Sequence, residues 1–192
     1  RHMRNHLHRA AEEIAAPLGI RFYLGLPDTV PDERLATVYR TSLVKAALTR
    51  PLLENLGMLW PRALLHRATL IPADADPNTR RTWAIEQPSY NGIGEVRAVA
   101  RVYSEFATGG SVLDLDSATL AELAGPPELP DSGRVDYLLR EPSWFRLGLF
   151  KPGRGFWFGS TVRSYGHPGL GGSMGFADPE LGLGFAYAPN RL

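Results

Sequence analysis

The chain has 192 residues, of which 44% are hydrophobic, and 21 basic against 20 acidic residues leave a net charge of +1. This size and content can bury the core of one globular domain, or of a substantial piece of one. The balanced charge argues against nucleic acid, which would need a concentrated basic face. No apolar run is long enough to span a membrane. The absence of cysteine excludes disulfides, a thiol nucleophile and a cysteine-based metal site. Without a signal-peptide pattern, a soluble cytoplasmic protein is favoured, although composition leaves the compartment unknown.

The first 90 residues are predicted to form helices and a long loop. Apolar residues recur at helical spacing over residues 5–16. A short extended run, RFYLGLP, follows and ends at a proline. Residues 31–48 are predicted to form a second helix, and LLENLGMLW a further helical piece. Residues 72–90 contain three prolines and little periodicity, so we expect an ordered loop or lid.

The second half of the chain changes from helical to strand periodicity. Residues 92–108 have the clearest apolar stripe, and Gly109-Gly110 ends it. A short helix is predicted over 117–124, N-capped by Asp116 or Ser117. From Trp144 onward the pattern has a period of two, which predicts strands. The strand candidates are WFRLGLF, GFWFG, RSYGH, GSMGFAD and LGLGFAYA.

The last two strand candidates predict an antiparallel hairpin around Asp178-Pro179-Glu180. In the final run, bulky residues (Leu183, Phe185, Tyr187) alternate with small ones (Gly184, Ala186, Ala188), so one face of the sheet is nearly bare. A bare face lets a helix lie close. We therefore expect an α/β (α+β) sandwich, with helices on both sides of an antiparallel sheet. Residues 1–192 would form a single partial domain, divided into 1–90 and 91–192.

A candidate site lies in the strand before that hairpin. Tyr165, His167 and Gly169 share a face, and Pro168 suggests an edge position beside a cleft, because proline cannot donate to a ladder. The glycines that follow, Gly171 among them, would let a ligand approach the backbone. The backbone N–H of Leu170 is then a candidate donor to an oxyanion.

The run GHPGLGGSMGFADPELGLGFAYAPN resembles the C-terminal strands of the β-lactamase-related (class C-like) serine hydrolases and esterases. Two upstream runs are similar to other parts of that family: IAAPLGIRFYLGLPDTVPDERLA to a helix and turn, and PSYNGIGEVRAVARVYSEFATGGSVLDL to the helix before the strands. The resemblance extends over most of the chain in the right order. It implies a β-lactamase/transpeptidase-like fold, apparently incomplete at its N-terminus.

In that family a serine of an S-x-x-K motif attacks an ester or amide, and the lysine and a Y-x-N tyrosine act as bases. One helical turn places such a lysine beside the serine hydroxyl, whose proton it can accept. The resemblance implies that His167-Pro168-Gly169 is the third motif, with Leu170 donating to the oxyanion and Tyr165, Pro168, Gly169 and Gly171 contacting a small ester or amide. It implies no cofactor. Histidine in place of the usual lysine favours esters over β-lactams.

The first two family motifs are not found where the resemblance expects them, so this chain alone is expected to be inactive. Ser42 and Lys45 do match S-x-x-K, and Ser89-Tyr90-Asn91 matches S-x-N. Both patterns are short and lie in segments that resemble other parts of the family fold. We expect Ser42 and Lys45 to belong to an ordinary amphipathic helix.

Three other patterns have simpler explanations. His2, His6 and His8 lie close enough to bind a metal but sit at a chain end, so we predict no metal site. Gly92-Ile93-Gly94 lacks the third glycine of a dinucleotide fingerprint and is interpreted as a helix entry. Trp157 and Phe158 must face opposite sides of a strand, so one of them could face the cleft.

Three functional hypotheses follow. The first is the C-terminal part of an esterase-like serine hydrolase that uses an acyl-enzyme. The second is a non-catalytic binding or scaffold protein that retains the fold, and the third is a compact enzyme that uses Ser42 and Lys45. Under the first, a sheet face would lack its covering, and the chain should associate with the missing N-terminal half or with itself.

Overall fold

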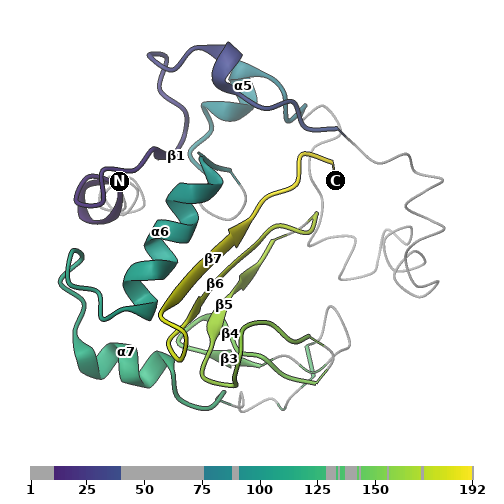
Figure 1. Cartoon of the computed structure of the whole chain (residues 1–192). Helices are drawn as coiled ribbons and strands as arrows, with labels where there is room; N and C mark the ends of the chain where they lie inside the picture. The colour runs from purple at the N-terminus through teal and green to yellow at the C-terminus, as the bar shows by residue number, and fades with distance from the viewer. Residues whose placement is uncertain are drawn as a thin grey trace.

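The computed structural model describes residues 11–39, 76–87, 91–128, 133, 135–136, 142, 144–154, 156–169 and 171–191. Within these residues, a five-stranded antiparallel sheet has the order β3-β4-β5-β6-β7, and β1 pairs with β2 in a small separate sheet (Figure 1). The elements are η1 (Ala11–Ala15), β1 (Phe22–Leu24), η2 (Asp32–Arg34), α5 (Arg80–Trp83), β2 (Gly92–Gly94), α6 (Val96–Ala107), α7 (Ser117–Leu123), β3 (Phe145–Arg146), β4 (Leu149–Phe150), β5 (Tyr165–Pro168), β6 (Met174–Asp178) and β7 (Leu183–Tyr187).

The predicted C-terminal hairpin is confirmed. β6 and β7 pair antiparallel from Met174↔Tyr187 to Asp178↔Leu183, around the predicted turn. β5 pairs with the other edge of β6, which sets His167 opposite Gly175. The period-two pattern therefore predicted these two strands, and the turn chemistry predicted their antiparallel pairing.

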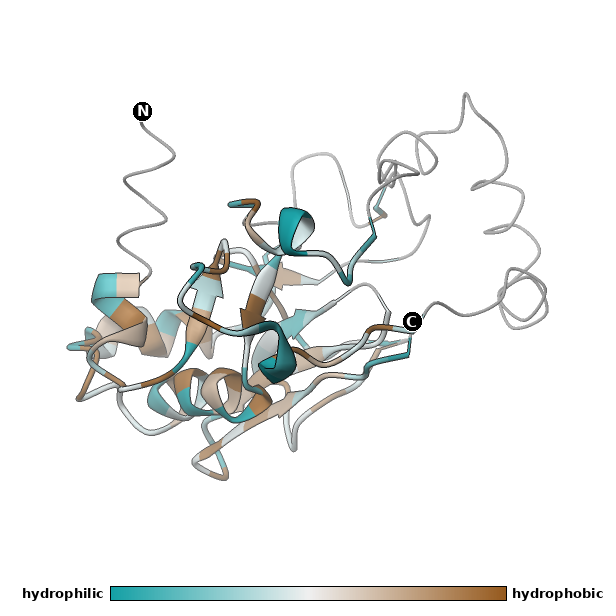
Figure 2. Cartoon of the chain, turned by 90° about the horizontal axis from the view of Figure 1, so that it is seen from above, coloured by the Kyte–Doolittle hydropathy of each residue, from teal (hydrophilic) through white to brown (hydrophobic). Residues whose placement is uncertain are grey.

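Helix α6 lies directly on the bare face of this hairpin (Figure 1). A Cβ atom at position 184 would overlap the backbone of Ser104 and Ala100, so only glycine permits this approach. The buried cluster beneath the helices contains Tyr165 and Ala177, both 0% exposed, together with Leu123 of α7. α6 is amphipathic, with apolar and polar residues on different sides (Figure 2). Helix α6 and the short helix α7 therefore lie on one face of the sheet, whereas the sequence analysis expected helices on both sides; the described residues place no helix on the other face.

The opposite face presents a row of aromatic rings. Phe176 and Phe185 stack with centroids 4.9 Å apart, and Phe158 lies 5.5 Å from Phe176. Phe185 and Tyr187 are 40% and 55% exposed. We call Phe156, Phe158, Phe176, Phe185 and Tyr187 the aromatic row. Among the described residues, much of this row is exposed to solvent.

The helix predicted over 31–48 is not present in its described part. The single turn η2 ends at Leu35 in extended backbone, and residues 36–38 belong to no helix or strand. The reason is tertiary: the Asn78 amide accepts from the Val38 N–H at 2.7 Å and donates to the Val38 carbonyl at 3.0 Å. These bonds replace those that a helix would have supplied. The rest of that prediction, and the segment LLENLGMLW, lie outside the described residues.

Three boundaries also differ from the sequence-based predictions. Residues 92–94 form strand β2 rather than the start of a helix, and a Cβ at Gly92 would lie 2.7 Å from the Phe22 ring of the paired strand. Helix α6 therefore begins only at Val96. In the predicted strand GFWFG, Phe156 forms only an isolated bridge with Gly153, through reciprocal hydrogen bonds, and residues 157–159 belong to no strand. Within the predicted loop 72–90, α5 adds one helical turn capped by Thr79. The short helix α7, capped by Asp116, is confirmed.

Asp178 fixes the β6–β7 turn to the loop that precedes β5. Its buried carboxylate accepts hydrogen bonds from Ser160 N and Oγ at 2.6 and 3.0 Å, from Glu180 N at 3.2 Å and from Leu181 N at 3.4 Å. Burial by itself would raise the pKa of Asp178, but these donors together lower it below its usual value.

The Asp178→Asn variant should lose about 2 kcal/mol of unfolding free energy, because an amide NH₂ would face donors that now meet a carboxylate. The contribution of the carboxylate is fully present above the unfolded-chain pKa near about 3.9 and is lost as the pH falls through the lower folded pKa. Chemical denaturation from pH 7 to pH 2 should therefore show wild type and variant converging in acid. Asp116→Asn is the control, since asparagine caps a helix equally well; an equal loss there would contradict this role.

Candidate active site

A pocket of about 300 Å³ lies where α6, the ends of β5, β6 and β7, and the small β1–β2 sheet meet. His167 and Pro168 come from β5, Met174 and Gly175 from β6, and Tyr103 from α6. Its described lining residues include no Asp, Glu, Lys or Arg. The sequence-predicted motif thus lies at the wall of an uncharged pocket of a size suited to a small ligand.

The tautomer of His167 follows from its one side-chain hydrogen bond in this region. Nδ1 lies 2.6 Å from the Pro168 carbonyl oxygen. A carbonyl only accepts, so Nδ1 must donate, and in the neutral imidazole Nε2 is left with the lone pair. The ring is exposed and meets the Phe150 ring edge-on at 5.1 Å. Neutral His167 can therefore accept a proton or hydrogen bond at Nε2.

The turn after Pro168 is closed by its own backbone. Gly169 N donates to Ser173 O at 2.8 Å, and Gly172 N donates to Gly169 O at 3.1 Å. Gly171 and Gly172 have φ of 92° and 94°, which favours glycine. Gly169 lines the pocket, whereas Gly171 is exposed in the turn and does not. Leu170, the predicted oxyanion donor, lies outside the described residues.

Tyr165 does not contact the pocket, contrary to the role that the family resemblance implied. Its side chain is fully buried among the core residues, and its hydroxyl donates to the Phe106 carbonyl at 2.8 Å. Burial raises its pKa to about 12. The residue shares a strand face with His167 as predicted, but α6 and α7 cover its part of that face.

Lys151 is buried and has a structural role among the described residues. Lys151 is 1% exposed, and its Nζ donates to the carbonyls of Leu123 at 2.8 Å and Arg163 at 3.0 Å. Nζ also lies 5.2 Å from the centre of the Tyr165 ring. Burial, followed by the charges of Arg146 and Arg163, lowers the pKa of Lys151 to about 8. Lys151 ties α7 to the start of β5 and does not line the pocket.

The predicted alternative nucleophile pair, Ser42 and Lys45, lies outside the described residues, as do Ser89 and Tyr90. Asn91, the last residue of the S-x-N match, is described and buried. Its amide donates to the carbonyls of Thr82 at 2.8 Å and Ile85 at 2.6 Å. Those bonds hold the loop before β2, so Asn91 has a structural explanation.

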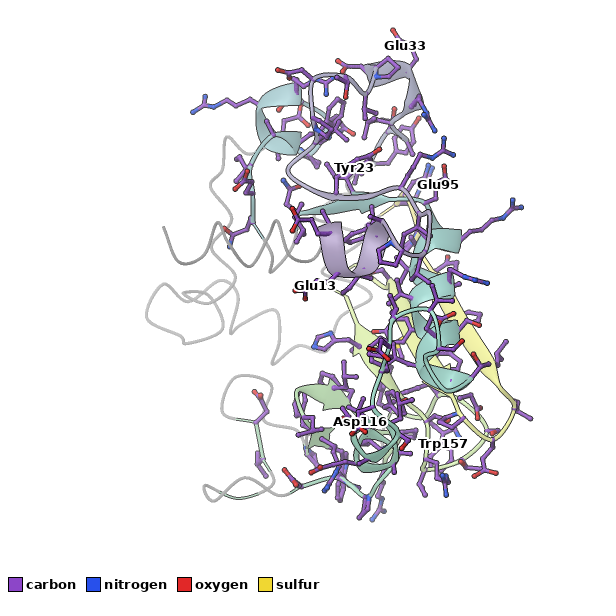
Figure 3. All side chains as sticks on the ribbon, turned by 90° about the vertical axis from the view of Figure 1, so that its left-hand side faces the viewer. Glu13, Tyr23, Glu33, Glu95, Asp116 and Trp157 are labelled. Atoms are coloured by element: carbon purple, nitrogen blue, oxygen red, sulfur yellow. The ribbon has the colours of Figure 1, made fainter. Side chains whose placement is uncertain are left out.

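Several pocket residues were missed by the sequence analysis, Tyr103, Phe22 and Met174 among them. Tyr103 belongs to an apolar helical stripe, and this pattern alone predicts a core residue. Trp157, considered as a cleft residue, is 59% exposed and lies at the far end of the molecule from Tyr23 and Glu95 (Figure 3), while Phe158 is buried in the aromatic row. The missed residues come together only through the packing of α6 on the sheet.

The described residues contain no group of three or more histidine, aspartate or glutamate side chains suited to hold a metal ion. None of the helices in this described part combines the length and apolar character that a bilayer crossing needs.

Comparison with known proteins gives a consistent assignment. The sequence profile of the Beta-lactamase family matches residues 11–192. "Esterase/beta-lactamase LipL" of Mycobacterium tuberculosis is 36% identical over 107 residues, which is 56% of this chain and 24% of that protein. Among solved structures, a family VIII carboxylesterase superposes with a TM-score of 0.71 at 26% identity, over 97% of this chain and 46% of its own.

Two further structures agree. EstA from Arthrobacter nitroguajacolicus Rue61a has a TM-score of 0.69 at 25% identity, over 96% of this chain and 48% of its own. A penicillin-binding protein homologue from Caulobacter crescentus has a TM-score of 0.67 at 26% identity, over 96% and 46%. The chain therefore has a β-lactamase/transpeptidase-like fold and spans less than half the length of these solved relatives and about a quarter of the curated one.

Proposed function

Because the chain belongs to the beta-lactamase family of serine hydrolases and esterases, we propose that it forms the third-motif wall of an esterase active site. The observation that supports this most directly is the uncharged pocket beside His167-Pro168-Gly169. The serine nucleophile and its lysine would come from the part of the family fold that this chain does not span. The wall alone would then be inactive.

The proposed reaction is acyl transfer through the serine. The serine oxygen attacks the ester carbonyl, and backbone N–H groups hold the oxyanion that forms, with Leu170 N–H as one proposed donor. Collapse of the tetrahedral intermediate expels the alcohol, and water then opens the acyl-enzyme. With Nδ1 donating to the Pro168 carbonyl, Nε2 of neutral His167 would accept a hydrogen bond and help to orient the substrate or its leaving group.

The charge of the pocket supports uncharged esters as substrates. A β-lactam antibiotic bears a carboxylate, which a permanent cation in the third motif would pair with. Here the motif has histidine, and the described lining has no lysine or arginine. Burying an unpaired carboxylate in such surroundings is unfavourable.

The open sheet face supports a partner for this chain: the other half of the family fold. β7 is an edge strand among the described residues, so its outer N–H and C=O groups have no neighbouring strand there. The aromatic row beside it includes Phe185, 40% exposed, and Phe156, 45% exposed. If the other half of the fold did not cover these rings and this strand edge, apolar surface would remain exposed to water.

Fluorophosphonate labelling of the chain alone and of the full-length protein, followed by peptide mapping, tests where the nucleophile lies. We expect an adduct only in the full-length protein, on a serine of an S-x-x-K motif outside this chain. An adduct on Ser42, lost in Ser42→Ala, would instead support a compact enzyme. The absence of any adduct in both would favour a scaffold protein.

Replacement of His167 tests the wall. In the full-length protein, His167→Ala should lower kcat/KM for 4-nitrophenyl butyrate on the order of 100-fold, since the substrate loses an orienting contact. His167→Gln, which keeps an acceptor, should recover part of that loss, and labelling of the serine should persist in both. Unchanged ester turnover in His167→Ala would contradict the assignment of this wall.

Replacement of Phe185 tests the partner. In the full-length protein Phe185→Asp should cost about 3 kcal/mol or more of unfolding free energy, because the ring would be covered there. In the isolated chain, where the ring is part-exposed, the cost should be much smaller. Ile85→Asp, at a residue 44% exposed and outside the aromatic row, is the control and should cost little in both. Dimerisation of the isolated chain that Phe185→Asp abolishes would point to a second copy instead.

A further inference from the structure

The most buried part of the described pocket lining is one close contact between α6 and β6, at Gly175. Gly175 is buried, and a Cβ atom there would overlap the Tyr103 ring and lie 3.2 Å from Val99 Cγ1. Gly175 is also the residue that pairs with His167 across β5 and β6. The Tyr103 ring therefore rests on the strand position next to the proposed wall.

The Tyr103 ring is held in that position from two sides. Gly175 lies beneath it, and the Phe106 ring lies 6.4 Å from it along the same helix. Burial raises the pKa of Tyr103, more than a backbone hydrogen bond with His167 lowers it, so the phenol stays neutral. This part of the pocket is thus aromatic, uncharged and restrained.

The other lining residues are small, flexible, exposed or held elsewhere; Phe22, the other half-buried aromatic of the lining, lies against Gly92 and Gly94 of the small sheet. Gly92, Gly94, Ala186 and Ala188 have minimal side chains. Met174 is flexible and adapts to a ligand, and Tyr187 is more than half exposed. Tyr103 differs from these residues because its helix, α6, packs on the sheet and its ring lies directly against Gly175 of β6.

We propose that Tyr103, resting on Gly175, is a specificity-determining residue that limits the length of the acyl group accepted beside His167. This inference rests on the esterase function proposed above. The pocket has a volume of about 300 Å³, and a cavity of about 150 Å³ holds one benzene ring, so an acyl group of moderate length fits and the Tyr103 ring would stop it from extending further. In an apolar pocket each methylene changes the specificity constant by roughly 10- to 200-fold.

The test is the chain-length profile of the full-length protein with 4-nitrophenyl acetate, butyrate and hexanoate. Tyr103→Leu should raise the hexanoate-to-acetate ratio of kcat/KM about tenfold or more, because the pocket deepens. Gly175→Ala should lower the ratio, because the added methyl pushes the ring into the pocket. Tyr103→Phe retains the ring and should leave the ratio unchanged.

Tyr165→Leu is the matched control. Its ring lies 6.5 Å from Phe106, close to the 6.4 Å of Tyr103, in the same helix–sheet contact but outside the pocket. Whatever it does to the total rate, the chain-length ratio should stay at the wild-type value. An equal change in Tyr165→Leu and Tyr103→Leu would reduce the effect to loosened packing and overturn the proposal.

The two proposals fail in different ways. Turnover with an unchanged ratio in Tyr103→Leu would overturn the role of Tyr103 and leave the esterase function standing. Absence of turnover in wild type would overturn the esterase function. In that case, chemical-shift titration of 2-pentanone and 2-nonanone into the same variants measures pocket depth without turnover, and unchanged relative affinity in Tyr103→Leu would overturn this inference too. Should Tyr103→Leu not fold, Tyr103→Trp tests the opposite sign.

Discussion

The close contact of helix α6 with the bare side of strands β6 and β7 is the constraint on which the rest of the structure depends. At position 184 the helix backbone occupies the space that any side chain would need. Such an approach buries the aromatic side chains between helix and sheet, among them Tyr165 and Phe106, with little room for voids. The same approach places the N-terminal turns of α6 over the ends of the strands, where the pocket opens.

The two faces of the sheet differ in residue size and in what covers them. The face with small residues receives α6 and α7 and closes the core. The other face presents aromatic rings that touch one another but remain partly exposed, at 40% for Phe185 and 45% for Phe156. A chain that spans less than half of its solved relatives is consistent with this asymmetry. The covered face contributes to the pocket, and the aromatic face is partly exposed among the described residues.

The lining of the pocket contains no Asp, Glu, Lys or Arg among the described residues. His167 is held in one tautomer by the carbonyl of the next residue, so its acceptor nitrogen is defined by local backbone geometry. The turn after Pro168 uses its own N–H and C=O groups to close. Lys151 and Asp178, both buried, hold the elements on either side of β5 and take no part in the pocket. The polar residue His167, which lines the pocket, and the two that hold the scaffold are thus different residues.

The sequence by itself determined the C-terminal strands, their hairpin, the bare face, α7 with its Asp116 cap and the family, because these depend on local periodicity, turn chemistry and a long specific motif. It also located His167-Pro168-Gly169, which lines the pocket. Only the tertiary structure decided the rest. Asn78 captures the backbone of Val38 from 40 residues away and prevents a helix there. Pairing with β1 makes a strand of Gly92–Gly94. Tyr165 and Tyr103 occur in similar apolar patterns, yet Tyr165 is buried in the core and Tyr103 lines the pocket. The position of α6 on the sheet decides this, and it depends on packing between distant segments, not on either residue's neighbours in the chain.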